Sequence, residues 1–324
     1  MNRRHLVSLH DLGAGELAEI LGRARRHAED NEPVRTQPVR TLSGCVVGLN
    51  FRWVSTRTRT AFSVGAMRLG AQVISYGPQD LQENAGESPE DTARVLSKML
   101  DALIVRSSGS LAKLRVMTRQ SSMAIVNALT DDEHPTQALA DLSVLSLRFG
   151  LLDGLQVMYL GEGNNTAAAL ALAVAHIPRA RLHLRTPAGY GLPQESLAFA
   201  KSAAASSGAH IEEMHDAELL PDEVNVVYTT RWEAMGVPKE KPNWRTEFWP
   251  FRVTDALMQE YPHAVFMHDL PAHRGEEVES SVIDGPQSIV FSQAQHKLFS
   301  AMAVLEWCID PDSFASRSET LPWS

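Results

Sequence analysis

The stretch "CVVGLNFRWVSTRTRTAFSVGAMRLGA", residues 45–71, places a short apolar run directly before a helical pattern. Its first part predicts a buried strand, and Phe62, Ala66 and Leu69 then recur at the spacing of one helix face. A second apolar run, residues 72–77, begins immediately afterwards. Strand, helix and strand in this order are typical of a parallel sheet, because parallel neighbours need a crossover connection. The stretch therefore predicts an α/β fold.

The same alternation of apolar runs and helical patterns continues along the chain. Strands that alternate with helices indicate parallel sheets with helices on both faces, so we expect doubly wound sheets. The predicted strands are residues 45–51, 72–77, 101–106, 123–129, 155–161, 181–186, 224–230 and 263–269.

We expect two domains. One helical run ends at Gly150, and a polar turn at Asp153-Gly154 follows it, with predicted strands on both sides. The final helical run, residues 292–307, comes after the last predicted strand, and we expect it to pack back on the first domain. The predicted domains are residues 1–148 plus 293–324 and residues 149–292.

Composition excludes several classes of function. The chain has 324 residues and a formal net charge of -9, which disfavours non-specific binding to nucleic acid or to anionic membranes. No apolar run is long enough to cross a bilayer or to serve as a signal peptide. Cys45 and Cys308 lie far apart, without the spacing of a disulfide framework or a zinc site. We expect a cytoplasmic protein with no metal, cofactor, nucleic-acid partner or membrane partner.

Polar residues that follow the predicted strands are candidate binding residues, because ligands of open α/β sheets lie beyond the carboxyl ends of the strands. Ser55 and Thr56 supply a cap at the start of the first helix, and Arg57 follows them. Such a helix start favours an anion, since the free N–H groups and the helix dipole both attract negative charge. The same residues are equally compatible with an ordinary capped helix and solvated arginines.

Three further residues have the same kind of position. Arg106 ends a predicted strand, and His134 and Gln137 open a helix whose first turn contains Pro135. Taken singly, each fits a structural explanation, such as a salt bridge at a strand end or a histidine cap. Taken together, a cation, an imidazole, an amide and a phosphate cradle suit a dianionic phosphate joined to a carbonyl that carries an NH2 group.

The second half of the chain opens with "YLGEGNN", residues 159–165. Two glycines after a strand suggest a dinucleotide site, but the G-x-G-x-x-G pattern fails because its third glycine is replaced by Thr166. We expect Asn164 and Asn165 to form hydrogen bonds with a polar substrate instead. Further along, residues 235–251 lack a clean period, and we interpret them as a mobile loop on the substrate side.

Six segments, which span nearly the whole chain, form a recognisable set when taken in order. They are "STRTR" (55–59), "DTARVLSKMLDALIVR" (91–106), "LTDDEHPTQALADL" (129–142), "YLGEGNN" (159–165), "HDLPAHRGEEV" (268–278) and "SIVFSQAQHKLFSAMAVL" (288–305). Together they resemble the aspartate/ornithine carbamoyltransferase family. The sequences "DTARVLS", "LTDDEHPTQALADL" and "LPAHRGEEV" are more similar to the ornithine branch of this family.

The resemblance implies transfer of a carbamoyl group from carbamoyl phosphate to an amine, in amino-acid metabolism, by a homotrimer whose active sites are shared between subunits and whose two domains close on the substrates. It places Gln82 in a neighbouring subunit's site and makes the Leu270-Pro271 bond cis. The implied catalytic residues are Arg57, Arg106, His134 and Asp269. The implied carbamoyl phosphate ligands are Ser55, Thr56, Arg57, Thr58, Gln82, Arg106, His134, Gln137, Leu270 and Lys297.

The acceptor side departs from the ornithine enzymes. Asp269 stands where they have cysteine, and Thr230 and Ala234 stand where they have the Asp and Ser of a D-x-x-x-S-M-G segment. Loss of that acid and hydroxyl leaves an α-ammonium poorly paired, at a cost of about 1–3 kcal/mol. We therefore do not expect free L-ornithine bound in the usual pose. The implied acceptor residues are Asn164, Asn165, Thr230, Arg231, Glu233, Ala234, Met235, His268, Asp269 and Arg274.

"TTRW", residues 229–232, also resembles the segment with which the aspartate branch binds a substrate carboxylate. Our hypothesis is that Arg231 binds an acceptor carboxylate, while Asp269 or Glu233 receives the amine. The alternative is that Arg231 is solvated. Two other functions stay open at this point: an ordinary ornithine carbamoyltransferase that forms citrulline, and a retired relative that only binds carbamoyl phosphate.

Overall fold

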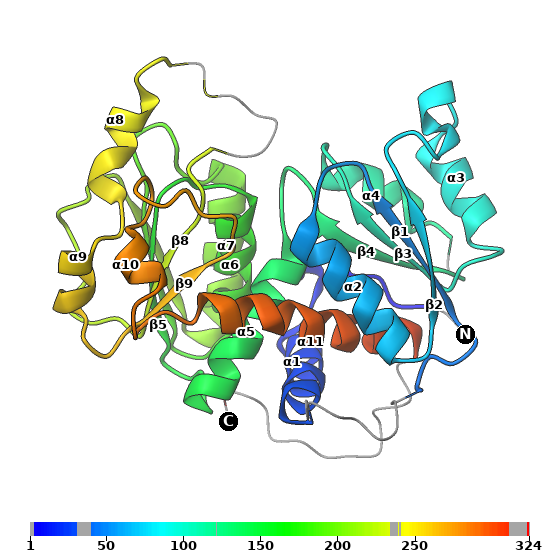
Figure 1. Cartoon of the computed structure of the whole chain (residues 1–324), viewed down its shortest axis with the longest axis horizontal. Coiled ribbons are helices and arrows are strands. Elements are labelled where there is room, and N and C mark those ends of the chain that lie inside the picture. Colours follow the sequence, from blue (N-terminus) through cyan, green and yellow to red (C-terminus); the bar gives the residue numbers. More distant parts are fainter. Residues whose placement is uncertain are drawn as a thin grey trace. The chain divides into compact units, whose positions relative to one another are not determined.

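A computed structural model describes residues 3–30, 40–120, 122–233, 239, 241–310 and 323, with the side chain of Asn84 left out. The described residues form two compact units (Figure 1). The first contains the residues up to Gly150 and those from Gln295 onward in the last helix, and the second is Leu151–Ala294.

The first unit contains a parallel sheet with the strand order β2-β1-β3-β4. Its strands are β1 Val46–Phe51, β2 Gln72–Tyr76, β3 Ala102–Arg106 and β4 Ala124–Leu129. Its helices and 3-10 turns are η1 Leu9–Asp11, α1 Ala14–Glu29, α2 Thr56–Arg68, η2 Gln82–Ala85, α3 Pro89–Leu96, α4 Leu111–Met117, α5 Pro135–Phe149 and, from Gln295 onward, α11 Val290–Ile309.

The last helix packs on the first unit, as the sequence predicts, and Figure 1 shows α11 beside α1 and α2. His27 Nε2 of α1 lies 2.9 Å from Glu306 Oε2 of α11. Ser143 of α5 and His296 of α11 form a buried hydrogen bond of 2.8 Å. Close approach to α2 depends on Gly65, where a Cβ would lie 3.2 Å from Met302. The helix therefore belongs to the core of this unit.

The second unit contains a parallel sheet with the strand order β7-β6-β5-β8-β9. Its strands are β5 Gln156–Leu160, β6 Arg181–Arg185, β7 His210–Met214, β8 Val226–Thr229 and β9 Val265–His268. Its helices and 3-10 turns are α6 Asn165–Ala175, α7 Gln194–Ser207, α8 Trp244–Phe248, η3 Trp249–Phe251, α9 Asp255–Glu260 and α10 Ser280–Ile283.

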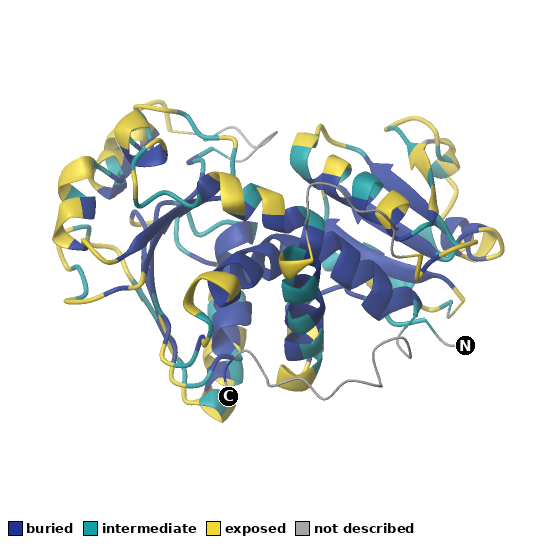
Figure 2. Ribbon diagram, turned by 60° about the horizontal axis from the view of Figure 1, so that its bottom comes forward, coloured by how far each residue is buried: buried dark blue, intermediate teal, exposed yellow. Residues whose placement is uncertain are grey.

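All eight predicted strands are present, and the fold class, two doubly wound parallel-sheet units, is confirmed. The sequence prediction missed β7. Its sequence "HIEEM" carries charged and polar residues on a partly exposed sheet edge, so it lacks the continuous apolar run of a central strand. Burial follows the sheets in Figure 2, where strands are mostly dark blue and outer helix surfaces mostly yellow.

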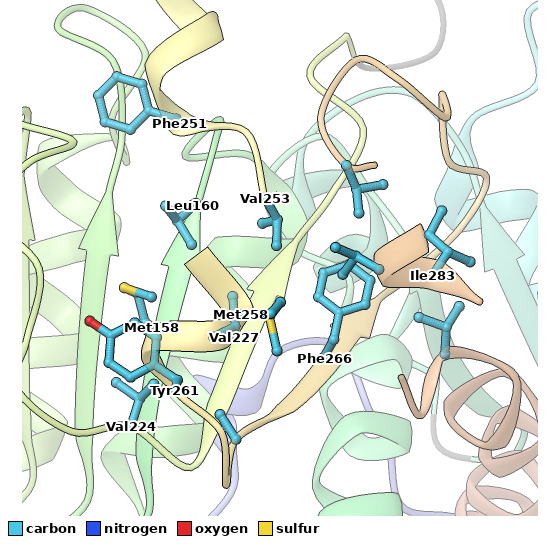
Figure 3. Close-up of a cluster of buried hydrophobic side chains, with 14 residues drawn as sticks. Met158, Leu160, Val224, Val227, Phe251, Val253, Met258, Tyr261, Phe266 and Ile283 are labelled. Atoms are coloured by element: carbon cyan, nitrogen blue, oxygen red, sulfur yellow. The ribbon is translucent and has the colours of Figure 1, made fainter. Parts of the chain in front are cut away.

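One face of the second sheet packs against a cluster of apolar side chains (Figure 3). Leu160 of β5, Val227 of β8 and Phe266 of β9 contribute from the sheet, and Val253 and Met258 pack with them. All five are at most 4% exposed. This core fixes the three strands whose carboxyl ends carry most of the predicted acceptor residues.

The prediction of a mobile loop at residues 235–251 is wrong for its last part. Residues from Trp244 to Phe251 form α8 and η3, and Trp244 and Phe248 pack with Trp232 in a second apolar cluster. Residues 234–238 and 240 lie outside the described residues. None of the helices in the described part of the chain has the length and apolar character needed to cross a membrane.

Candidate active site

The carboxyl ends of β1, β3 and β4 meet at one edge of the first sheet. Arg106, the last residue of β3, pairs in register with Phe51 of β1 and Leu129 of β4. The Arg52 N–H donates to the Arg106 carbonyl at 3.0 Å. Because α2 begins just after β1 and α5 just after β4, this edge brings two helix starts to a buried arginine.

The start of α2 has the features of an anion site. Ser55 is its N-cap, and the serine hydroxyl makes no capping hydrogen bond, so the first N–H groups of the helix are not covered by that side chain. Thr56 is exposed, Arg57 is half-buried and Thr58 is buried. The helix has 13 residues, which is long enough for its dipole to favour negative charge at this end.

A buried asparagine holds the turn that leads to His134. Asn127 donates to the Val7 carbonyl at 2.9 Å and accepts from the Leu129 N–H at 3.0 Å. Leu129 has a positive φ of 152°, a conformation that this local hydrogen bond supports. His134 then caps α5, and Pro135 occupies the first turn as the sequence predicts.

His134 is a buried imidazole that two cations act on. Burial lowers the pKa of His134 well below its usual value, and the positive charges of Lys297 and Arg106 lower it further. One ring nitrogen, Nδ1, lies 3.4 Å from the Thr136 hydroxyl. At neutral pH the ring therefore carries one N–H donor and no charge.

Lys297 and Gln137 are linked directly. The Lys297 ammonium donates to the Gln137 Oε1, and the Gln137 Nε2 donates to the buried Asp141 carboxylate at 2.7 Å. The amide is therefore held in one orientation, with its oxygen toward the ammonium. Four of the predicted carbamoyl phosphate residues thus lie in one cluster: Arg106, His134, Gln137 and Lys297.

Glu133, which the sequence analysis did not select, anchors the residue before His134. It is 2% exposed, and its carboxylate accepts from the Ser8 hydroxyl at 2.5 Å and the Leu9 N–H at 2.8 Å. Burial raises the pKa of Glu133 to about 7, although these two hydrogen bonds oppose the shift. A glutamate in a polar turn gives no sequence signal of such burial.

Gln82 lies apart from this cluster in sequence and begins η2 with an exposed side chain. Its neighbour Glu83 pairs with Arg52 at 2.8 Å and with Lys113. These ion pairs tether η2 to the loop that follows β1 and to α4.

In the second unit, Asn164 caps α6 by accepting from the Thr166 and Ala167 N–H groups at 3.0 and 3.2 Å. Its Nδ2 donates to the Thr230 hydroxyl at 3.0 Å. That hydroxyl also lies 3.1 Å from the Tyr159 hydroxyl. Thr230 is 2% exposed, so its hydroxyl is buried with two protein partners.

Asp269 lies at the start of α6. The Thr166 hydroxyl donates to Asp269 Oδ2 at 3.1 Å, and Asn165, the first residue of α6, is half-buried. Burial raises the pKa of Tyr159 well above its usual value, and the negative charges of Asp269 and Glu162 add to this, while the Thr230 hydrogen bond opposes it. Asp269 and the network of Asn164, Thr230 and Tyr159 are therefore neighbours.

His268 has a defined tautomer. Its Nδ1 accepts from the Leu270 N–H at 2.8 Å, so the ring proton sits on Nε2, which lies 3.2 Å from the buried carboxylate of Glu277. Its 3.5 Å contact with Asp269 Oδ1 involves an unprotonated nitrogen and is not a salt bridge. The Leu270-Pro271 bond is cis, as predicted.

The remaining acceptor residues differ in their surroundings. Arg231 is half-buried, and its Nε has no hydrogen-bond partner among the described residues. Glu233 is half-buried, and Ala234 and Met235 lie outside the described residues. Arg274 is exposed and forms a two-point ion pair with Asp284, at 2.5 and 2.8 Å. The structure therefore does not bring Arg274 together with the Asn164 network.

Sequence reasoning overlooked Tyr159 and Thr166. Tyr159 lies inside an apolar strand, where its hydroxyl gives no separate signal, and Thr166 drew notice only as the residue that breaks a glycine pattern. Gly163 also proves to be structural, because a Cβ there would lie 2.2 Å from the Leu192 nitrogen. Within the described ranges, no group of three or more His, Cys, Asp or Glu side chains could hold a metal ion.

Both parts of the chain match models of one protein family. The model described as "Aspartate/ornithine carbamoyltransferase, carbamoyl-P binding domain" matches residues 4–146. The model described as "Aspartate/ornithine carbamoyltransferase, Asp/Orn binding domain" matches residues 153–308.

Similar curated proteins include two ornithine carbamoyltransferases. That of Symbiobacterium thermophilum is 39% identical over 304 residues, which cover 93% of this chain and 96% of that protein. That of Acidothermus cellulolyticus is 38% identical over 311 residues, covering 95% and 97%. Among solved structures, ornithine carbamoyltransferase from Pyrococcus furiosus has a TM-score of 0.88 at 35% identity, covering 95% of this chain and 97% of that chain.

We predict that Glu133→Gln flattens the dependence of stability on pH between about 4.5 and 7. Because the folded pKa of Glu133 is raised to about 7, its contribution is fully present below its unfolded value near 4.5 and is lost as pH rises through 7. A shift of this size corresponds to up to about 3 kcal/mol. Urea unfolding at several pH values measures the effect, with Glu90→Gln on the partly exposed start of α3 as control. Parallel pH profiles for wild type and Glu133→Gln would contradict it.

Proposed function

This chain belongs to the aspartate/ornithine carbamoyltransferase family and is a carbamoyltransferase, and we propose that its acceptor is an ornithine-like or other amino acid rather than L-ornithine bound in the usual pose. In the reaction, the uncharged amine attacks the carbonyl carbon of carbamoyl phosphate, a C–N bond forms, and the C–O bond to phosphate breaks. The amine loses a proton, and phosphate leaves as the second product.

One observation carries the proposed role of the first unit: the His134 imidazole is buried, and the charges of Lys297 and Arg106 help to keep it neutral. Negative charge develops on the carbonyl oxygen during attack, and donors already aimed at that oxygen stabilise it. We assign this task to Arg106 and His134, because the guanidinium keeps its charge and the neutral ring keeps one N–H. Gln137, held by Lys297 and Asp141, would orient the carbamoyl NH2 group.

The phosphate end would bind at the start of α2. Ser55, Thr56, Arg57 and Thr58 supply hydroxyls, backbone N–H groups and a guanidinium at one helix end. Arginine suits this position, because its planar fork forms paired, charge-assisted hydrogen bonds with phosphate oxygens. The same contacts stabilise phosphate as it leaves with its additional negative charge.

Two features of the second unit support a changed acceptor. The Thr230 hydroxyl, at the position where the resemblance implies an acid in the ornithine enzymes, is buried against Asn164 and Tyr159. Asp269 instead presents a carboxylate at the start of α6, beside this network. We propose that the negative charge has moved to Asp269, which receives the amine end of the acceptor and accepts the proton that the amine sheds.

We assign the acceptor carboxylate to Arg231. Its Nε is buried without a hydrogen-bond partner among the described residues, which suits a guanidinium that pairs with a ligand. Asn164 and Asn165 would contribute amide groups to the same acceptor. Glu233, Ala234, Met235, His268 and Arg274 keep the acceptor-side roles that the family resemblance implies, as proposals.

Two further proposals concern the setting of the reaction. We propose a homotrimer with Gln82 and Leu270 completing the carbamoyl phosphate ligands, Gln82 from a neighbouring subunit. The edge strand β2 supports an interface, because Ile74 on it is 44% exposed and Trp53 and Val54 of the loop after β1 are exposed too.

We also propose a cytoplasmic location, which the two free cysteines support.

A second candidate is ordinary ornithine carbamoyltransferase activity. It is favoured by the relatives, because the curated proteins similar to this chain at 35–39% identity carry that name. The two candidates share the carbamoyl phosphate site and differ only in the acceptor.

Phosphate release separates these functions. We expect the protein to release phosphate from carbamoyl phosphate in the presence of one or more amino acids or diamines from a panel, with L-ornithine at least about tenfold lower in kcat/KM, the loss that about 1.4 kcal/mol of missing pairing produces. Highest kcat/KM with L-ornithine would establish the second candidate. No release with any amine would leave a carbamoyl phosphate-binding relative.

Asp269→Cys tests the proposed transfer of charge. We expect it to lower turnover of the preferred acceptor by at least about a hundredfold, the usual effect of removing a proton acceptor, and to raise the relative rate with L-ornithine. Asp269→Asn is the matched variant, because it keeps the shape of the side chain and removes only the charge. Unchanged acceptor preference in both variants would contradict the assignment.

Arg231→Ala tests the carboxylate contact. We expect a rise of at least about tenfold in the KM for the acceptor, with a change of less than about twofold in the KM for carbamoyl phosphate, since a charge-assisted pair is worth about 1.5–3 kcal/mol. Arg181→Ala, at the exposed opposite end of β6, is the control. An unchanged acceptor KM would mean that Arg231 has no part in binding.

A further inference from the structure

We propose that Lys239 is a positioning residue for the acceptor site, which acts by holding Glu162 and, through it, the loop that carries Asn164. The expected effect on acceptor binding rests on the proposed function, whereas the contacts of Lys239 do not depend on it. We use the name lysine cage for Lys239, Glu162, Tyr190, Trp244 and Phe248.

The lysine cage surrounds the Lys239 ammonium. Lys239 Nζ lies 4.7 Å from the ring centres of Tyr190 and Phe248 and 5.4 Å from that of Trp244. It also pairs with Glu162 Oε1. The Lys239 side chain is only 6% exposed. Aromatic faces and a carboxylate are the groups that stabilise a desolvated cation in proteins.

The low exposure of the Lys239 side chain is unusual for a lysine. Lysine side chains are among the least often buried, because removal of the ammonium from water is costly unless it is paired. Lys241, two residues further along, is exposed and pairs with Glu247 at 3.0 Å, and its Nζ lies 5.7 Å from the ring centre of Tyr190. Of the two lysines, only Lys239 also contacts Glu162, Trp244 and Phe248.

The Glu162 carboxylate has Lys239 as its cationic partner. Burial raises the pKa of Glu162, the Lys239 hydrogen bond and charge lower it, and the charge of Glu233 raises it. The other carboxylate oxygen, Oε2, is buried without a hydrogen-bond partner among the described residues. In the part of the chain that the structure describes, the charged groups that act on the Glu162 carboxylate are Lys239 and Glu233, and the Tyr159 hydroxyl contacts the Glu162 carbonyl. Without Lys239, the carboxylate would keep no cationic partner among them.

The backbone of Glu162 connects the lysine cage to the Asn164 network. The Glu162 carbonyl accepts from the Tyr159 hydroxyl at 2.6 Å and from the Asn164 N–H at 2.8 Å. The next residue, Gly163, donates its N–H to the Tyr190 carbonyl at 2.8 Å, so Tyr190 belongs both to the cage and to the contact that holds the loop. A shift of Glu162 would therefore move Asn164 and Tyr159, and with them their hydrogen bonds to Thr230.

Loss of the Lys239 charge should affect the binding of the acceptor and not that of carbamoyl phosphate. The lysine cage and the Asn164 network lie in the second unit, whereas Arg106, His134, Gln137 and Lys297 lie in the first. Loss of the Lys239 charge should therefore raise the KM for the acceptor and leave the KM for carbamoyl phosphate unchanged. It should also be relieved by removal of the Glu162 charge, because the harm comes from an unpaired buried carboxylate.

Lys239→Met is the main variant, because methionine keeps the apolar stem against the aromatic rings and removes only the ammonium. We expect the KM for the acceptor to rise about tenfold, the effect of about 1.4 kcal/mol, with kcat at saturating acceptor and the KM for carbamoyl phosphate within about twofold of wild type. Lys241→Met is the matched control and should leave all three values unchanged. The ratio of the acceptor KM of Lys239→Met to that of wild type at the same pH should also fall as pH is lowered, since protonation of Glu162 removes its charge.

The double variant Glu162→Gln with Lys239→Met decides between positioning and simple loss of packing. We expect it to return the acceptor KM to within about threefold of wild type, because no unpaired charge remains. A double variant no better than Lys239→Met, or a Lys239→Met indistinguishable from Lys241→Met, would overturn the inference.

Urea unfolding of wild type, Glu162→Gln, Lys239→Met and the double variant, without substrate, keeps this test separate from the proposed function. Non-additive unfolding midpoints for Glu162→Gln and Lys239→Met would establish the coupling whichever acceptor is used. Additive midpoints would overturn the lysine cage itself. If no amine in the panel gave phosphate release with the wild type, the proposed function would fail, while the coupling would still be measurable.

Discussion

Parallel pairing of strands is the constraint on which the site depends. Each parallel connection must return the chain to the same end of the sheet, so the residues that leave the strands collect at one edge. In the first unit this brings Arg106 and the starts of α2 and α5 together, although more than 80 residues separate Ser55 from Gln137. In the second unit it brings Asn164, Thr230 and Asp269 together in the same way.

Cationic side chains have different surroundings in the two units. Its overall charge is -9, yet Arg106 and Lys297 are buried beside His134 and lower the pKa of that ring. This local field is suited to an incoming anion. The Lys239 side chain is also covered in the second unit, but its charge is matched by Glu162 and it lies against aromatic rings. We propose that the first arrangement receives a charged group and that the second holds a loop in place.

Sequence patterns predicted most of the fold, because each central strand is a continuous apolar run followed by a helical period. They failed at β7, whose charged residues lie at a sheet edge, and at α8, which is short and held by Trp244 and Phe248 rather than by its own periodicity. The predicted site residues of the first unit form a cluster for the same reason that the fold was predictable: they follow strands directly. Lys239 was missed because its partners come from three other segments, and no spacing in the sequence relates them.

A glycine after a strand, such as Gly163, can be required for two different reasons. After a strand, a pair of glycines is commonly associated with a nucleotide, whose pyrophosphate needs access to bare backbone. Here the space that a Cβ would occupy is filled by residue 192 of the same chain. The glycine is therefore a steric marker for two loops that touch backbone to backbone. Whatever amine this protein carbamoylates, Gly163 is explained by the packing of these two loops and gives no information about the ligand.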